Sequence, residues 1–122
     1  MRSWKVYTLS AAVFSLAVIP FFSGEAASGE TLNAYIGTYT RGDSEGIYRL
    51  TLEVDGDSIK SKKLELAAKT DNPSFVALHP DGKHLYAVGE LGTFEGKPSG
   101  AVHAYKIKDD GSLERINSQP SL

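Results

Sequence analysis

Residues 72–90 read NPSFVALHPDGKHLYAVGE, and this stretch decides the fold class. Two apolar runs, at residues 75–78 and 85–88, flank a turn that contains Pro80, Asp81 and Gly82. Proline presets the first turn torsion and Asp-Gly tolerates positive φ, so the stretch predicts a β-hairpin. Neither strand alternates apolar with polar residues, which indicates a sheet that is covered on both faces. Such a sheet is one layer of a stack.

The rest of the chain after residue 28 repeats this pattern of short strands and turns. Further strands are expected at residues 32–40, 47–54, 63–68, 101–108 and 113–118. Glycine- and aspartate-rich turns separate them at intervals of roughly ten residues, and no helical period interrupts them. The pattern predicts an all-β fold.

Two segments of the chain echo each other. Residues 47–56 and 102–111 each combine an apolar strand with an Asp-Gly turn, and Tyr35 aligns similarly with Tyr86. Two units of roughly fifty residues, each a small antiparallel sheet, are typical of a β-propeller, although any two hairpins share turn chemistry. Because a propeller ring closes with about four to eight blades, we expect this chain to supply about two blades of a longer protein.

The first 28 residues have the features of an export signal. Arg2 and Lys5 precede an uncharged run at residues 6–22, and small residues follow it. This order predicts an N-terminal signal helix that is cleaved after Ala26 or Ser28, and hence a periplasmic or extracellular protein. A membrane anchor is the alternative, although the run is at the short edge for a span. The expected organisation is a signal peptide at 1–28 and a truncated propeller domain at 29–122.

The composition excludes several classes of function. The 122 residues carry a net charge of −2 and no cysteine. Scattered basic residues leave no electrostatic footprint for nucleic acid, and the lack of cysteine excludes disulfides and thiolate metal sites. An exported domain without disulfides must rely on burial alone, which requires a larger core than this chain can build. After signal cleavage we expect no stable membrane span.

Three stretches resemble the lactonase family of seven-bladed β-propellers. They are AYIGTYTRGDSEGIYRLTL at 34–52, DNPSFVALHPDGKHLYAVGE at 71–90 and SGAVHAYKIKDDGSLERIN at 99–117. The family includes the propeller type of 6-phosphogluconolactonase and 3-carboxymuconate cyclase proteins. The resemblance covers about residues 33–119 in the right order. Gly89 is a departure, since members commonly carry asparagine before the glutamate.

The resemblance implies an activity for the parent protein. It implies hydrolysis of a carbohydrate lactone such as 6-phosphogluconolactone, without metal or cofactor, in a central channel lined by residues of later blades. Those blades are not in this chain, so no catalytic residue is carried over and the chain alone is expected to be inactive. A phosphorylated sugar lactone is cytosolic whereas the leader directs export, so another lactone is also a candidate. A non-catalytic propeller that binds a ligand or protein, and a muconate-type cycloisomerase, remain open as alternatives.

Four residues are local candidates for a role at a site. Glu90 follows an inner strand and opens a glycine-rich loop, so it could touch a substrate at the channel mouth; the competing interpretation is a solvated carboxylate. His79 is interpreted as a turn residue whose ring packs on the neighbouring strand. His84 opens a strand and His103 is placed on the polar side of another. Neither has a second histidine or carboxylate at ligand spacing, so the sequence predicts no metal site.

Three short motifs are interpreted as turns or loops. Residues 41–43 spell the adhesion tripeptide Arg-Gly-Asp inside a polar turn. Residues 55–57 spell Asp-Gly-Asp but lack the further acidic ligands that calcium requires. The loop at 92–100 lacks the Gly-Lys-Ser/Thr ending of a phosphate-binding loop, and no helix is expected after it.

Overall fold

The computed structural model describes residues 6–7, 16–20 and 29–121. These residues form nine strands and no helix, which confirms the all-β prediction. The strands are β1 (Val6–Tyr7), β2 (Leu16–Pro20), β3 (Glu30–Ile36), β4 (Gly46–Asp55), β5 (Ser58–Lys69), β6 (Phe75–Leu78), β7 (His84–Gly89), β8 (Ala101–Ile107) and β9 (Leu113–Pro120).

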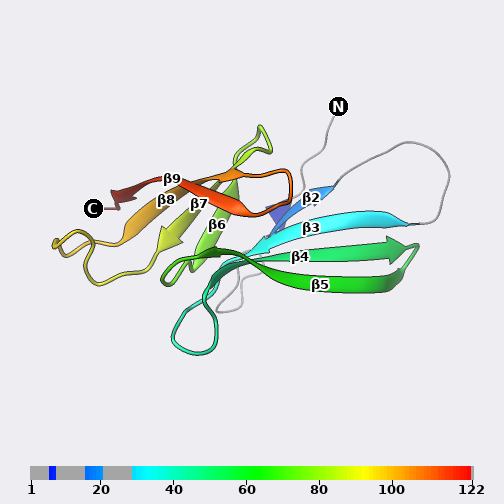
Figure 1. Cartoon of the computed structure of the whole chain (residues 1–122), viewed down its shortest axis with the longest axis horizontal. Helices are drawn as coiled ribbons and strands as arrows, with labels where there is room; N and C mark the ends of the chain where they lie inside the picture. The colour runs from blue at the N-terminus through cyan, green and yellow to red at the C-terminus, as the bar shows by residue number, and fades with distance from the viewer. Residues whose placement is uncertain (1–5, 8–15, 21–28, 122) are drawn as a thin grey trace.

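The nine strands form two antiparallel sheets that follow the order of the chain. One sheet has the order β1-β2-β3-β4-β5 and the other β6-β7-β8-β9. Figure 1 shows the two sheets as neighbouring layers, one coloured from blue to green and the other from yellow-green to red. Strand β2 contacts β6, and β5 contacts β9, so strands at corresponding places in the two sheets lie against each other.

Strands β6 and β7 form the hairpin that residues 72–90 predict. The register runs from Phe75 opposite Val88 to Leu78 opposite Leu85. The turn is closed by the N–H of His79, which donates to the carbonyl of His84 at 2.9 Å. Gly82 has a φ of 67°, the left-handed conformation for which a glycine was expected in this turn.

Two strand boundaries differ from the prediction by four or more residues, and the others by no more than two. Strand β5 runs from Ser58 to Lys69 rather than over 63–68, because the Asp-Gly turn at 55–56 brings its polar first half against β4 over the whole length. Strand β3 ends at Ile36 rather than at residue 40. The Thr38 hydroxyl donates to the carbonyl of Gly46 at 2.7 Å, which turns the chain away from the sheet.

The core lies between the two sheets. Its largest fully buried side chains include Tyr35 and Ile47 from the first sheet and Leu85 and Tyr105 from the second. Polar contacts also connect the same layers. The Tyr35 hydroxyl donates to the carbonyl of Gly111 at 2.7 Å, and the Arg115 guanidinium donates to Thr70 Oγ1 at 2.9 Å. Both sheets therefore share one core that is tied by hydrogen bonds.

The outer face of each sheet is apolar and open. The register places Phe75, Val88 and Val102 side by side on the outer face of the second sheet, where Phe75 is 48% exposed. On the first sheet, Leu64 and Leu66 are also exposed. Contiguous exposed apolar patches commonly mark interaction surfaces. The hairpin is apolar on both faces as predicted, with one face covered by the first sheet.

The internal echo of the sequence corresponds to equivalent places in the two sheets. Tyr35 lies in the strand before β4 and Tyr86 in the strand before β8. Tyr35 is 1% exposed beneath the second sheet, whereas Tyr86, on the outer face, is 40% exposed. The two Asp-Gly turns also match, since Gly56 and Gly111 have φ of 57° and 80°. Strands β3-β4-β5 of the first sheet therefore correspond in order to strands β7-β8-β9 of the second.

The helix expected in the leader is wrong for the leader residues that the structure describes. Leu16–Pro20 forms strand β2 and pairs with β3, from Leu16 opposite Ile36 to Pro20 opposite Leu32. An edge strand presents unpaired N–H and C=O groups, and a second strand satisfies them. The expected cleavage positions, Ala26 and Ser28, lie outside the described residues. Within the described residues, none forms a helix that could cross a membrane.

Tyr35 gives the fold an expected sensitivity to alkaline pH. Burial raises its pKa from 10.0 to about 12. Between these values the tyrosine ionises in the unfolded chain but stays protonated in the fold, so the free energy of unfolding falls as the pH rises. Tyr35→Phe should abolish this pH-dependent fall in the free energy of unfolding. At neutral pH the substitution also removes a hydrogen bond worth about 0.5–1.5 kcal/mol.

Urea unfolding followed by circular dichroism, from pH 8 to pH 12, measures both effects. Tyr86→Phe is the matched control, because Tyr86 occupies the equivalent place on the open face. Identical pH profiles for the native chain and Tyr35→Phe would contradict the assignment.

Candidate functional site

Three loops meet at the end of the molecule where β3, β5 and β7 finish. They comprise residues 37–45, 70–74 and 90–100. Hydrogen bonds join Thr40 to Asn72, Asn72 to Glu90, and Tyr39 to Glu90. Residues that are far apart in sequence therefore form one polar cluster, and it contains Glu90, the best candidate from the sequence.

Glu90 directly follows β7, as predicted, and its carboxylate is exposed. The hydroxyl of Tyr39 donates to its Oε2 at 2.5 Å. This bond raises the pKa of Tyr39, because ionisation would remove the donated proton beside a negative carboxylate. Tyr39 therefore holds one side of the carboxylate, and the exposed side chain can accept a hydroxyl or amide donor from solvent or a ligand.

Asn72 connects the three loops. Its side-chain oxygen accepts bonds from the Thr40 N–H at 3.0 Å and the Thr40 hydroxyl at 3.2 Å. Its amide nitrogen donates to the carbonyl of Glu90 at 3.3 Å, and its own carbonyl accepts from the Glu90 N–H at 3.0 Å. Asn72 also has a φ of 42°, a left-handed conformation that asparagine tolerates better than most residues. It holds the backbone of Glu90 in place.

Sequence reasoning missed both Tyr39 and Asn72. Their partners lie 51 and 32 residues away along the chain, so no spacing pattern connects them. The available signal was the Asn-Pro pair at 72–73, which favours a turn immediately before a strand. It located a loop but did not show which other loops that loop contacts.

His103 lies on the inner face of β8, and the prediction that it is on the polar side is wrong. Its side chain is 4% exposed, and its Nδ1 lies 2.7 Å from Oγ of Ser118. Burial, followed by the positive charge of Arg115, lowers its pKa. Apolar residues flank His103 on both sides, Val102 and Ala104, so the strand pattern did not identify its inner face. His103 is a buried, hydrogen-bonded histidine in the core.

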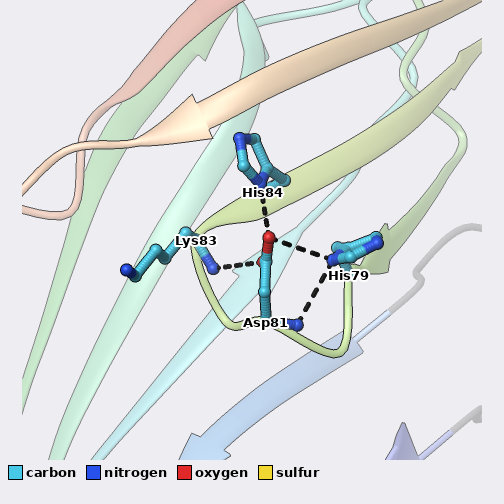
Figure 2. A network of polar contacts seen from close by, with 4 residues as sticks. All are labelled: His79, Asp81, Lys83 and His84. Carbon is cyan, nitrogen blue, oxygen red and sulfur yellow. Dashed lines mark hydrogen bonds and ion pairs between the residues drawn. The ribbon is translucent and has the colours of Figure 1, made fainter.

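His79 and His84 both contact Asp81, and the prediction that His84 has no ligand partner is wrong. Figure 2 shows the three side chains converging above the β6–β7 turn. Oδ2 of Asp81 lies 2.7 Å from Nδ1 of His84 and 3.1 Å from Nδ1 of His79. The expected ring contact of His79 with the neighbouring strand is present, with its centroid 6.1 Å from that of Tyr86. This cluster is at the opposite end of β7 from Glu90.

A pocket of about 320 Å³ lies between the sheets at the same end as the β6–β7 turn. Its lining includes Arg49, Lys83 and Lys108. The Arg49 guanidinium donates to the carbonyl of Asp110, so this cation binds the protein's own backbone. We therefore assign the pocket to the contact between the sheets rather than to the site around Glu90.

The three short motifs are in turns and loops, as expected. Residues 41–43 are in the exposed part of the β3–β4 loop, and 55–57 form the β4–β5 turn. In the loop at 92–100, Phe94 and Lys97 form an isolated bridge. None of the three contributes to the cluster of histidines and Asp81.

The two-layer fold, with its repeated sheets and open apolar faces, agrees with the comparison to known families. Residues 33–122 match the family described as lactonase, 7-bladed beta-propeller. The chain belongs to this lactonase family. Its two sheets are consistent with part of a propeller ring.

Several bacterial proteins are similar to this lactonase chain. It is 40% identical over 86 residues to the 6-phosphogluconolactonase of Bacillus subtilis strain 168, which covers 70% of the chain and 23% of that protein. An uncharacterized protein of Staphylococcus saprophyticus is 38% identical over 89 residues, covering 71% and 23%. An uncharacterized protein of Staphylococcus epidermidis is 35% identical over 83 residues, covering 68% and 22%. The chain spans about a quarter of the length of these curated relatives.

In this lactonase chain, Gly89 leaves room for the buried histidine. A Cβ atom at position 89 would lie 2.9 Å from Nε2 of His103. Asparagine, the residue that the family resemblance implies here, would therefore require the His103 ring to move. The glycine at position 89, in place of the asparagine of the family, therefore fits the close packing of His103 on the neighbouring strand β8.

Proposed function

We propose that the protein containing this chain hydrolyses a sugar lactone, with 6-phosphogluconolactone as the first substrate to test. The observation that carries the proposal is the 40% identity over 86 residues to a protein named 6-phosphogluconolactonase. The apolar outer faces of both sheets support it, since further blades of a ring would cover them. Export by the N-terminal leader is part of the same proposal.

Lactone hydrolysis requires water to add to the ring carbonyl and the ring C–O bond to break. A general base takes the proton of the water, and the ring oxygen receives a proton as the C–O bond breaks. Hydrogen-bond donors stabilise the oxyanion that forms on the carbonyl oxygen. We propose that these groups are side chains of the complete ring and that the reaction needs no metal. The described residues contribute Glu90 as a contact to a substrate hydroxyl.

The position of Glu90 in its sheet supports this role. The edge strand β9 carries exposed Glu114, Asn117 and Gln119, which suit an outer, solvated edge. The opposite edge strand, β6, is short and apolar, which suits the inner edge of a ring around a central channel. The loop that begins at Glu90 follows β7, the strand next to this inner edge. A carboxylate there would reach a ligand in the channel.

Hydrolysis assays on the full-length protein and on residues 1–122 test the proposal. We expect the full-length protein to open 6-phosphogluconolactone faster than the spontaneous reaction. The short chain should show no rate above that background, because it lacks the groups of the later blades. Unphosphorylated gluconolactone is the matched control substrate, because the difference between the two rates measures the contribution of the phosphate group. Binding of a lactone without turnover by the full-length protein would instead favour a non-catalytic propeller.

A further inference from the structure

The turn between β6 and β7 gathers two imidazoles and one carboxylate from six consecutive residues. One potential ligand atom from each of His79, Asp81 and His84 lies within 4.8 Å of the other two. The carboxylate is oriented from its other side, where the N–H of Lys83 donates to Oδ1 at 2.7 Å. This bond is the main reason that the pKa of Asp81 is lowered. Oδ2 is therefore negatively charged and directed at both rings (Figure 2).

Hydrogen bonding alone does not satisfy every contact in this cluster. Nδ1 of His79 lies 3.2 Å from the backbone N–H of Asp81, where it must accept, and 3.1 Å from Oδ2, where it would have to donate. A single ring nitrogen cannot do both, because the two roles belong to different tautomers. When Nδ1 accepts the N–H, two lone pairs face each other. A cation at this point would bind both atoms.

We propose that His79, Asp81 and His84 form a binding site for a divalent transition-metal ion, with Zn²⁺ as the probe. Two imidazole nitrogens and a carboxylate oxygen are ligands that zinc accepts, with water completing the tetrahedron. In a tetrahedron, bonds of about 2.0–2.2 Å place adjacent ligand atoms about 3.3–3.6 Å apart. The N–O separations of 3.1 and 2.7 Å are shorter than this, so the two rings would move outward slightly to admit the ion. In the bound state His79 Nδ1 exchanges the backbone N–H for the metal.

The surroundings of the cluster leave room for the ion. The three side chains are between 36% and 45% exposed, so water can supply the remaining ligands. The nearest cation in sequence, the ammonium of Lys83, points away from the cluster (Figure 2). The ion would tie the two ends of the hairpin turn together. This inference is independent of the proposed lactonase function, because Glu90 is at the other end of β7.

Zinc titration of residues 1–122, without an added histidine tag, tests the proposal. We expect one ion per chain by competition with a chromogenic chelator. Loss of an outer-shell partner alone weakens a metal site by about 10–100-fold, so His79→Gln and His84→Gln should each weaken binding by at least that much. Asp57→Asn, in the other acidic hairpin turn, is the matched control and should bind as the native chain does. If both histidine variants bound zinc as tightly as the native chain does, the proposal would be overturned.

A measurement on the native chain removes any dependence on how the variants fold. Zinc should shift the ring-proton resonances of His79 and His84 in NMR spectra and leave those of His103 unchanged. His103 is buried and bound to Ser118, which makes it an internal reference. Absence of any shift at His79 and His84 with zinc in excess would also overturn the site.

Discussion

Replacing Phe75 with alanine is expected to have little effect in residues 1–122 and to cost about 3–5 kcal/mol in the full-length protein. In the short chain the ring is 48% exposed on the open face of the second sheet, so its removal leaves no internal cavity. In a longer protein the next blade would cover this face, and the same change would create a cavity. Urea unfolding of both proteins, with and without the substitution, measures the difference.

Leu85→Ala is the control for this experiment. Leu85 is fully buried between the two sheets in the chain itself, so its truncation should cost about 2–5 kcal/mol in either protein. A small and equal cost of Phe75→Ala in both proteins would mean that nothing covers the outer face. The proposal that this sheet is one layer of a larger ring would then fail.

In the full-length protein, Glu90→Gln is expected to lower kcat/KM for the lactone by about 10- to 150-fold, the equivalent of one charged hydrogen bond of about 1.5–3 kcal/mol. The loss should appear mainly in KM, because a hydroxyl of the sugar is bound in the ground state as well as in the transition state. The neutral amide keeps the size of the side chain and can still accept the bond from Tyr39. Steady-state kinetics at several lactone concentrations separate the two parameters.

Glu114→Gln supplies the comparison for Glu90→Gln. Glu114 is exposed on the outer edge strand β9, and its neutralisation should leave both kinetic parameters unchanged. If both variants behave like the native protein, Glu90 is a solvated loop carboxylate and has no contact with the substrate. A fall in kcat alone would also contradict the assigned role.

The sequence was most informative where structure is decided locally. Pro80 and the Asp-Gly pair after it specify the turn within a few residues, and the hairpin at 75–89 followed as predicted. The length of β5 was missed because its polar first half has no apolar signal of its own. The backbone of β4 opposite it determines where the pairing stops. The local sequence was enough to predict that a strand exists. The length of the strand depended on the neighbouring strand with which it pairs.

The site was harder to predict than the fold, for three physical reasons. Glu90 was found because it ends a strand, but Tyr39 and Asn72 reach it across loops that only the packing of the two sheets brings together. The inner position of His103 was missed because its strand is apolar on both sides. Asp81 was missed as a partner of the histidines because a tight turn folds the chain back on itself. Linear ligand spacing does not describe that geometry.

The two uncovered faces described above are unlike each other, since one belongs to the front of a repeating unit and the other to its back. Subunits with such surfaces associate head to tail, and the result is a closed ring or an endless filament according to the rotation at each joint. A seven-membered circle cannot be divided into pairs. Copies of this two-sheet unit alone therefore cannot build a seven-bladed ring: three copies leave one blade missing, and four copies supply one blade too many.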